Sequence, residues 1–399
     1  MSSLETTHRI EPTHLAHPTT AISDLIAELA AGTATLGKAL HPKTAANLAD
    51  LVRLMNTYYT NLIEGHHSRP KDIERALKGQ LDENPHRRNL QLEATAHIRV
   101  QADLDLKSQE GRLPDPASVS FLRSLHREFY KDAPSEFLQI TGAGREFTMK
   151  PGEWRSSPEH DVEVGRHMPP ESDRVAEFMK YFERCYRQEN LEGRSNKLIA
   201  LAAAHHRFNY IHPFPDGNGR VSRLMSHAMA HAAGVGAHGL WSISRGLARG
   251  LQSRTEYKAM MDLADSPRQG DLDERGNLSQ QALIQFVEWF LKICVDQVTF
   301  MSSLFELGTL SRRLRLYVER SETLKPEAAR LLEAALNHGE VERGDVAVLT
   351  GLPERTARRV LNDLISHGLL ASETPKGPVS LRFPSEAQEI LFPRLFPET

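Results

Sequence analysis

Twelve consecutive residues near the middle of the chain combine an imidazole, a carboxylate, a Gly-Asn-Gly turn and two guanidinium groups. Residues 212–223 read HPFPDGNGRVSR, with apolar, helix-compatible sequence on both sides. The pattern predicts a helix, a tight loop and a second helix whose first turn carries Arg220 and Arg223. Backbone N–H groups of a glycine-rich loop at a helix N-terminus bind anions. The two arginines, three residues apart, can lie on one side of that helix with planar groups suited to phosphate.

Two further groups in this string favour chemistry on the bound phosphates. Asp216 offers a hard oxygen ligand for a magnesium ion, and His212 is placed to take a proton from an incoming nucleophile. Taken singly, Asn-Gly is a common turn dipeptide, and a histidine beside proline is usually structural. The combination at this spacing predicts nucleotide-dependent group transfer.

The string resembles the motif of the Fic-domain family, HxFx(D/E)GNGRxxR, at every defined position. The resemblance implies a loop that binds ATP and Mg2+ and an enzyme that transfers AMP to a protein hydroxyl. It implies that His212 is the general base toward a Ser, Thr or Tyr, and that Asp216 holds the magnesium ion. The nucleotide-binding residues implied are Phe214, Gly217, Asn218, Gly219, Arg220 and Arg223. Gly219 stands where the Fic-like toxin kinases carry lysine, which favours AMP transfer over phosphate transfer.

A second motif lies upstream, where residues 60–65 read TNLIEG at the end of a predicted helix. On composition alone, Glu64 near a helix C-terminus is mildly unfavourable against the helix dipole and is expected to face solvent. The segment also resembles the Fic inhibitory motif, (S/T)xxxE(G/N), of the class with an upstream inhibitory helix. The resemblance implies that Glu64, with Thr60, holds Arg223 away from the γ-phosphate and keeps the enzyme autoinhibited. Some family members use this glutamate to activate water and remove AMP, and the sequence leaves that activity open.

A target-binding flap is predicted before the catalytic helices. Glycine and proline punctuate residues 142–170, and the run DVEVGRHM alternates as a strand would, which favours a β-hairpin or an extended flap. In Fic proteins a hairpin in this place pairs with the target backbone by strand addition. The predicted flap residues are Val162, Glu163, Val164, Gly165, Arg166 and His167. An ordinary surface hairpin is the alternative.

The rest of the sequence predicts a mainly helical fold in three parts. We expect a helical region over residues 1–105, with the inhibitory helix at about 43–65, then a Fic-type helical core with a small β-hairpin flap over 106–308. Residues 309–399 show three helices followed by strand, turn and strand, which predicts a winged helix-turn-helix domain. Basic residues begin its third helix, where DNA-binding proteins place their contacts. Contact with DNA and contact with protein both remain open, because the segment carries about as many acids as bases.

Composition excludes several classes of protein. The net charge of −3 gives no overall attraction to nucleic acid or to a membrane surface. No apolar run approaches the roughly 20 residues that span a bilayer, and the N-terminus lacks the pattern of a signal peptide, so we expect a cytoplasmic protein. The two cysteines, Cys185 and Cys294, lie far apart and imply neither a disulfide framework nor a cysteine-based zinc site.

Smaller candidates and alternative functions complete the interpretation. Tyr257 falls where Fic proteins often have a tyrosine pair beside the adenine, although Lys258 replaces the second tyrosine. The histidine pairs at 66–67 and 205–206 are poor metal sites, because adjacent residues point to different faces of a helix.

A Fic-type transferase with another nucleotide donor and a nucleotide-sensing DNA-binding regulator are the alternative functions. Beyond an unidentified protein substrate, self-modification and a homodimer are compatible with the sequence.

Overall fold

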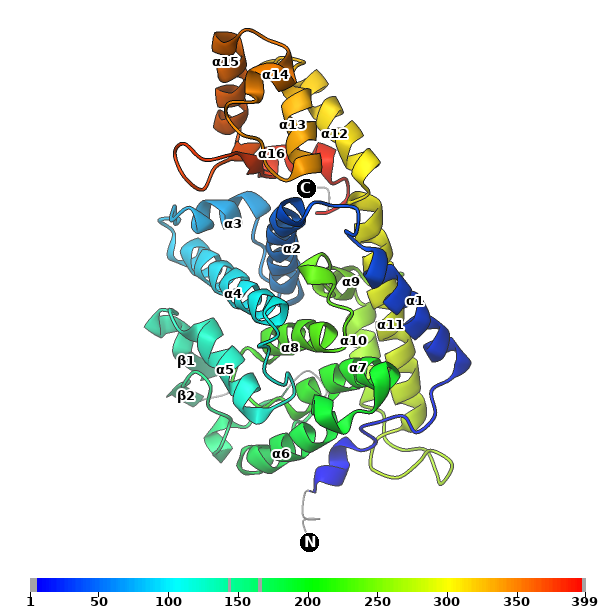
Figure 1. The fold of residues 1–399 in the computed structure, drawn as a ribbon. Coiled ribbons are helices and arrows are strands. Elements are labelled where there is room, and N and C mark those ends of the chain that lie inside the picture. Colours follow the sequence, from blue (N-terminus) through cyan, green and yellow to red (C-terminus); the bar gives the residue numbers. More distant parts are fainter. Residues whose placement is uncertain (1–5, 143–144, 164–166, 397–399) are drawn as a thin grey trace. The chain divides into compact units, whose positions relative to one another are not determined.

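The computed structural model describes residues 6–142, 145–163 and 167–396 and is mainly helical (Figure 1). The α-helices are Thr20–Thr35 (α1), Pro42–Ile63 (α2), Pro70–Leu77 (α3), Pro85–Gln109 (α4), Val119–Tyr130 (α5), Val175–Tyr186 (α6), Gly193–Ile211 (α7), Asn218–Ala232 (α8), Ser244–Arg249 (α9), Glu256–Ala264 (α10), Gln280–Leu304 (α11), Leu307–Arg320 (α12), Ala328–His338 (α13), Val346–Thr350 (α14), Glu354–Ser366 (α15) and Ser385–Leu391 (α16). Short 3-10 helices cover Thr7–Ile10, Ser135–Leu138, Pro158–His160, Ser172–Arg174, Gln188–Asn190 and Ala237–Gly239. The strands are Gln139–Gly142 (β1), Arg145–Thr148 (β2), Leu370–Ala371 (β3) and Ser380–Leu381 (β4).

The chain forms two compact units. The first contains Met1–Thr33, Asn56–Gly236 and Ser242–Gln297, and the second contains Ala34–Met55, Ala237–Trp241 and Val298–Thr399. All residues of the predicted catalytic and inhibitory motifs belong to the first unit. No helix among the described residues is both long enough and apolar enough to span a bilayer.

The core of the first unit surrounds α7 and α8, which pack against each other. The run LIALAAA at residues 198–204 of α7 is buried on every side, whereas α6 buries only one face. A helix that is apolar all round is expected at the centre of a core, with amphipathic helices around it. Helices α4 and α5 pack on α8, and α6 packs on α7. The loop at 212–217 joins the two buried helices, so the core fixes both of its ends.

Helix α2 ends where the sequence predicts. Gly65 has a positive φ of 82°, and the N–H of His66 donates to the carbonyl of Asn61 at 2.8 Å. A left-handed glycine followed by such a return bond is a common way to end a helix. The predicted stop at Gly65 is therefore confirmed, and it leaves Glu64 at the C-terminal end of the helix.

The β-hairpin of the first unit lies upstream of the predicted flap. Strands β1 and β2 pair antiparallel over Gln139–Thr148, with Gln139 opposite Thr148. Within DVEVGRHM, residues 161–163 have no regular secondary structure, His167 forms an isolated β-bridge, and Val164, Gly165 and Arg166 lie outside the described residues, so the flap stays a prediction. The Asp161 carboxylate accepts a hydrogen bond from the N–H of Ser172 at 2.8 Å. This segment is thereby tied to the loop before α6.

His167, the last of the predicted flap residues, lies against α7. Its Nε2 is 2.6 Å from the carbonyl oxygen of Tyr210 on α7, and the two rings are in contact with centroids 4.2 Å apart. Val162 and Glu163 lie in the loop before the undescribed residues. Their role in binding a target stays a prediction.

The C-terminal part of the second unit has the predicted order of elements. Helices α13, α14 and α15 precede the antiparallel pair β3 and β4, and Val341 forms a bridge with Val379 beside that pair. Leu331, Leu336 and Leu364 are fully buried between these elements. Three arginines in the first turns of α15 are exposed, namely Arg355, Arg358 and Arg359. Arg358 forms an ion pair with Glu354. Helix α16 follows the hairpin and was not predicted. The winged-helix interpretation and its DNA contact stay predictions.

Candidate active site

Two residues with left-handed backbone conformation bracket the motif loop. His212 ends α7 with φ 50° and ψ 60°, and Gly217 precedes α8 with φ 79°. A Cβ on Gly217 would also lie 2.7 Å from the Tyr130 hydroxyl, so glycine is required there on two grounds. His212 has a Cβ, and its left-handed backbone costs about 1 kcal/mol or more unless other contacts hold it.

Arg155 provides those contacts. Its side chain is 1% exposed, and its Nε donates to the carbonyl of His212 at 2.7 Å. Its Nη2 donates to the carbonyls of Pro170 and Ile211 at 2.9 and 3.1 Å. A guanidinium at the C-terminal end of α7 satisfies carbonyls that lack partners within the helix. No pattern in the sequence indicates that Arg155 positions His212.

The environment of His212 keeps its imidazole neutral. Burial and, to a smaller extent, the charge of Arg155 lower the pKa of His212 to about 4, although a hydrogen bond with the Asn209 backbone opposes them. The residue is nevertheless partly exposed, so a substrate hydroxyl can reach it. A neutral imidazole at neutral pH is the form that accepts a proton.

Phe214 and Asn218 shape the loop from inside. Phe214 is fully buried, with its ring stacked on His126 at a centroid distance of 3.8 Å. The Asn218 side chain accepts from the Phe214 N–H at 2.8 Å and donates to the Phe214 carbonyl at 2.7 Å. Both side chains thus close the loop on itself, and their role in binding the nucleotide stays a prediction.

Asp216 points out of the loop, and a hydrogen bond from Tyr130 at the end of α5 fixes its side chain. Its Oδ2 accepts a hydrogen bond from the Tyr130 hydroxyl at 2.8 Å, while its side chain stays 50% exposed. His126, one helical turn before Tyr130, lies with Nε2 at 3.2 Å from the Asp216 carbonyl, and its Nδ1 accepts from the Gly152 N–H at 2.8 Å. Burial lowers the pKa of His126 to about 4, so it acts as a neutral hydrogen-bonding group. An exposed carboxylate with a fixed orientation fits a magnesium ligand.

Arg223 is engaged by the predicted inhibitory residues. Its Nη2 donates to Glu64 Oε1, and its Nε donates to the Thr60 hydroxyl. Burial opposes ionisation of Glu64, but the charges of Arg223 and Arg220 hold the pKa of this carboxyl below its usual range. Gly219 makes the pairing possible, since a Cβ there would lie 2.5 Å from Glu64 Oε1.

Arg220 is also paired with a carboxylate, which the sequence did not predict. Its Nη2 lies 3.0 and 3.1 Å from the two carboxylate oxygens of Glu93 on α4. The Nδ1 of His66, just after α2, is 3.1 Å from Glu93 Oε2. Both motif arginines are thus held by acidic residues of neighbouring helices.

Tyr257 and the adjacent residues His205 and His206 are held by hydrogen bonds around α7. The hydroxyl of Tyr257 is 2.8 Å from His205 Nε2, and its buried ring stacks with Trp289 at 6.2 Å. His206 is buried, with Nε2 3.0 Å from the Asp265 carboxylate. These contacts tie α7 to α10 and to Asp265 just after it, and the place of Tyr257 beside the adenine stays a prediction.

Comparisons with known proteins agree with this geometry. The model of the Fic/DOC family matches residues 116–230. The curated proteins named protein adenylyltransferase Fic from Drosophila erecta and Drosophila melanogaster are 39% identical over 83 residues, which is 21% of this chain. The aligned stretch spans only 16% of the length of these relatives.

Solved structures show the same fold. A Fic family protein from Desulfovibrio desulfuricans G20 matches with a TM-score of 0.52 and 20% identity, over 92% of this chain and 98% of the other. A Fic domain containing signaling protein from Bacteroides thetaiotaomicron matches with a TM-score of 0.53 and 20% identity, over 72% of this chain and 98% of the other. The likeness therefore extends well beyond the motif.

Proposed function

Because this chain carries a Fic/DOC domain over residues 116–230, we propose that it is an autoinhibited protein adenylyltransferase that moves AMP from ATP to a Ser, Thr or Tyr hydroxyl. The observation that carries the proposal is the loop itself. A neutral His212 stands at one end of the loop, an exposed Asp216 lies just before the turn at Gly217, and both are held by buried partners. The relatives named protein adenylyltransferase support the choice of reaction over the stretch that they match.

The reaction breaks one bond and forms one. The target hydroxyl oxygen bonds to the α-phosphorus of ATP, the bond from that phosphorus to the bridging oxygen breaks, and pyrophosphate leaves. His212 accepts the hydroxyl proton during attack. Arg220 and Arg223 face the β- and γ-phosphates and stabilise the charge that develops on the leaving group. Magnesium, which Asp216 would hold, supplies positive charge to the phosphates.

Autoinhibition follows from the two acidic partners of these arginines. With Glu64 on Arg223, the guanidinium is unavailable to a γ-phosphate, and a negative charge stands where the triphosphate would end. ATP then binds without the alignment of its α-phosphate that in-line attack requires. A second activity of this glutamate would be hydrolytic removal of AMP, in which water activated by Glu64 bonds to the phosphorus while the bond to the target oxygen breaks and the free hydroxyl leaves.

Labelled ATP tests the proposed reaction directly. The Glu64→Gly chain is incubated with a cell lysate and with ATP labelled on either the α- or the γ-phosphate, and the modified residue is identified by mass spectrometry. We expect label from the α-phosphate alone, with an added mass of AMP on the chain itself or on a target. Label from the γ-phosphate would show phosphate transfer, and complete competition by another nucleotide would show a different donor. A lack of labelling by every nucleotide, together with tight DNA binding by the full chain, would favour a nucleotide-sensing regulator.

The pH profile should report the neutral state of His212. A base with a pKa of about 4 is already deprotonated at pH 6, so kcat/KM of the Glu64→Gly chain is expected to stay constant from about pH 6 to 8. With an ordinary histidine pKa of about 6.5, the rate at pH 6 would instead fall about fourfold below its value at pH 8. A single-turnover assay across this range, at saturating magnesium, decides between the two profiles.

Replacing Arg155 should affect the turnover number more than substrate binding. Arg155→Lys keeps the charge but loses the planar fork that contacts three backbone carbonyls, so His212 is no longer held in place. We expect kcat to fall about tenfold or more, because small misplacements of a catalytic group are costly, while KM for ATP changes less than about twofold. Arg184→Lys, on the exposed face of α6, is the matched control. Unchanged kcat in a folded Arg155→Lys chain would contradict the positioning role.

A further inference from the structure

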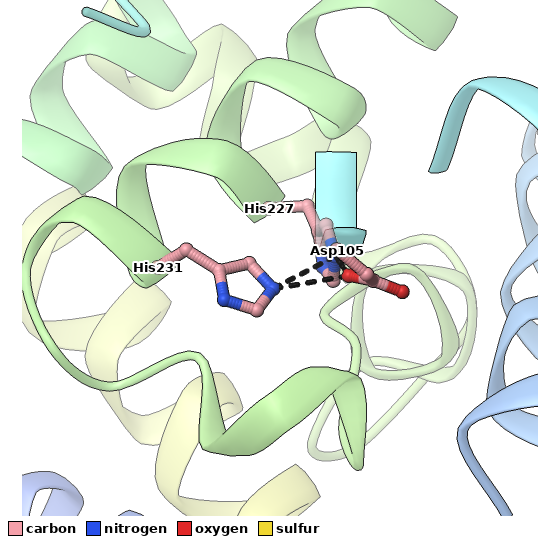
Figure 2. Close-up of side chains that lie close together, drawn as sticks. All are labelled: Asp105, His227 and His231. Atoms are coloured by element: carbon pink, nitrogen blue, oxygen red, sulfur yellow. Dashed lines mark hydrogen bonds and ion pairs between the residues drawn. The ribbon is translucent and has the colours of Figure 1, made fainter. Parts of the chain in front are cut away.

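A second cluster of reactive side chains lies further along α8, one helical turn after Arg223. His227 and His231 are four residues apart and continue the face of the helix that carries the two motif arginines. Asp105 of α4 faces them, and Figure 2 shows the three side chains converging from the two helices. The side chains of Asp105, His227 and His231 are only 2%, 6% and 5% exposed.

The ligand atoms of this cluster meet in a small volume. Asp105 Oδ1 lies 2.6 Å from His227 Nε2 and 3.1 Å from His231 Nε2, and the two Nε2 atoms are 3.2 Å apart. Around a divalent ion with bonds of 2.0–2.2 Å, neighbouring ligand atoms lie roughly 3.0–3.4 Å apart. Two of the three separations already fall in that range, and the third needs an opening of a few tenths of an ångström.

We propose that Asp105, His227 and His231 form a binding site for a divalent transition-metal ion of the zinc type. Two imidazoles and one carboxylate are a ligand set that such ions commonly take from proteins, with water completing the coordination. Nitrogen and oxygen ligands in this number favour zinc, cobalt or nickel over magnesium, which prefers oxygen ligands alone.

The surroundings of His231 support this role. The Ser108 hydroxyl lies 3.0 Å from His231 Nδ1, so the ring can donate from Nδ1 while Nε2 faces the ion. A hydrogen bond from the second ring nitrogen is the usual way in which a metal-binding histidine is oriented. Gly236 leaves room for the ring, since a Cβ there would lie 2.2 Å from His231 Nδ1. Ser108 is itself only partly buried, so the site is not sealed from solvent on this side.

An ion in this site would fix α4 against α8. The same two helices are joined nearer the motif loop by Glu93 and Arg220, so the pair would be held at two places along its length. The inferred role is structural. Metal binding here does not depend on AMP transfer, and it can be tested without measuring activity.

Metal content and cobalt absorption test the proposal. The full chain, without a histidine tag, is loaded with zinc, freed of excess metal and examined by elemental analysis, where about one ion per chain is expected. Replacement by cobalt should produce visible absorption bands from nitrogen and oxygen ligands. Asp105→Asn and His227→Gln should lose both signals, while His86→Gln, exposed in the first turn of α4, should keep them.

A thermal melt provides a second readout that does not rely on the variants. Zinc should raise the Tm of the wild-type chain and a chelator should lower it again, because a ligand that binds only the folded state stabilises it. The proposal is overturned if the wild-type chain binds no metal, shows no cobalt bands and does not change its Tm. Asp105, His227 and His231 would then form only a hydrogen-bonded cluster. Retention of metal by a folded His227→Gln chain would place the ion elsewhere and would equally overturn it.

Discussion

Glu64→Gly is expected to raise AMP transfer about ten- to hundredfold over the wild-type chain. The estimate follows from the contact that the substitution removes, in which Glu64 accepts a hydrogen bond from Arg223. A hydrogen bond between charged groups contributes about 1.5–3 kcal/mol, which corresponds to about ten- to hundredfold in an equilibrium constant. That factor is the expected increase in the ratio of chains with a free Arg223 to chains in which Glu64 holds it.

Related substitutions separate charge from backbone effects. Glu64→Gln keeps the size of the side chain and removes its charge, so it should also raise the rate, by less than Glu64→Gly. Thr60→Val removes the second acceptor of Arg223 and should give a smaller gain, because Glu64 still holds the guanidinium. Glu83→Gly, exposed before α4, should behave as the wild type.

Auto-modification with α-labelled ATP measures these rates on the purified chain. The double variant Glu64→Gly/Arg223→Ala should return to a low rate, since the gain depends on a free Arg223. Equal labelling of the wild-type and Glu64→Gly chains would show that Glu64 does not inhibit. If a modified wild-type chain loses AMP faster than the Glu64→Gly chain does, the glutamate would instead be assigned to the hydrolytic removal of AMP.

The elements that carry the motifs were predictable because their signals are local. The apolar spacing of α2 places Leu48, Val52, Met55 and Tyr59 on one buried face, and Gly65 ends the helix with a positive φ. The motif loop was equally predictable, since Gly217 and the flanking apolar helices specify a turn between two buried elements. The Glu64–Arg223 contact was predicted from resemblance alone, since 159 residues separate the pair and no local pattern encodes it.

The residues that hold the loop were not predictable, because they act across long separations in sequence. Arg155 looks like any surface arginine in a polar segment, yet packing buries it completely against the end of α7. Glu93 meets Arg220 only through the rotation of α4 against α8, which periodicity does not determine to the needed precision. The i, i+4 spacing of His227 and His231 was visible in the sequence, but their partner Asp105 lies 122 residues from His227.

The segment 161–168 shows where a local pattern stops being informative. Alternation in DVEVGRHM satisfies the rule for a half-buried strand. At its two ends, Asp161 accepts a hydrogen bond from the Ser172 backbone, and His167 lies against Tyr210. His167 and Tyr210 are 43 residues apart, so periodicity does not reveal this contact.

His212→Ala in the Glu64→Gly background is expected to lower AMP transfer about a hundred- to ten-thousandfold. This range is the usual contribution of a positioned general base. The environment of His212 fits that role, because burial and Arg155 keep the imidazole neutral and therefore able to accept a proton at physiological pH. The substitution also removes the only imidazole of the loop string 212–223, so no neighbouring histidine within that string can replace it.

Nucleotide binding should survive this loss, which distinguishes a catalytic base from a residue that builds the site. The contacts that close the loop run through the backbone of His212, whose carbonyl accepts from Arg155, and through Asn218 and Phe214. An alanine keeps that carbonyl, so ATP should raise the Tm of the Glu64→Gly and Glu64→Gly/His212→Ala chains by similar amounts. His86→Ala in the same background controls for the loss of an exposed histidine. Retained AMP transfer in the double variant would mean that another group takes the hydroxyl proton, whereas loss of both transfer and ATP stabilisation would mean that His212 supports the loop.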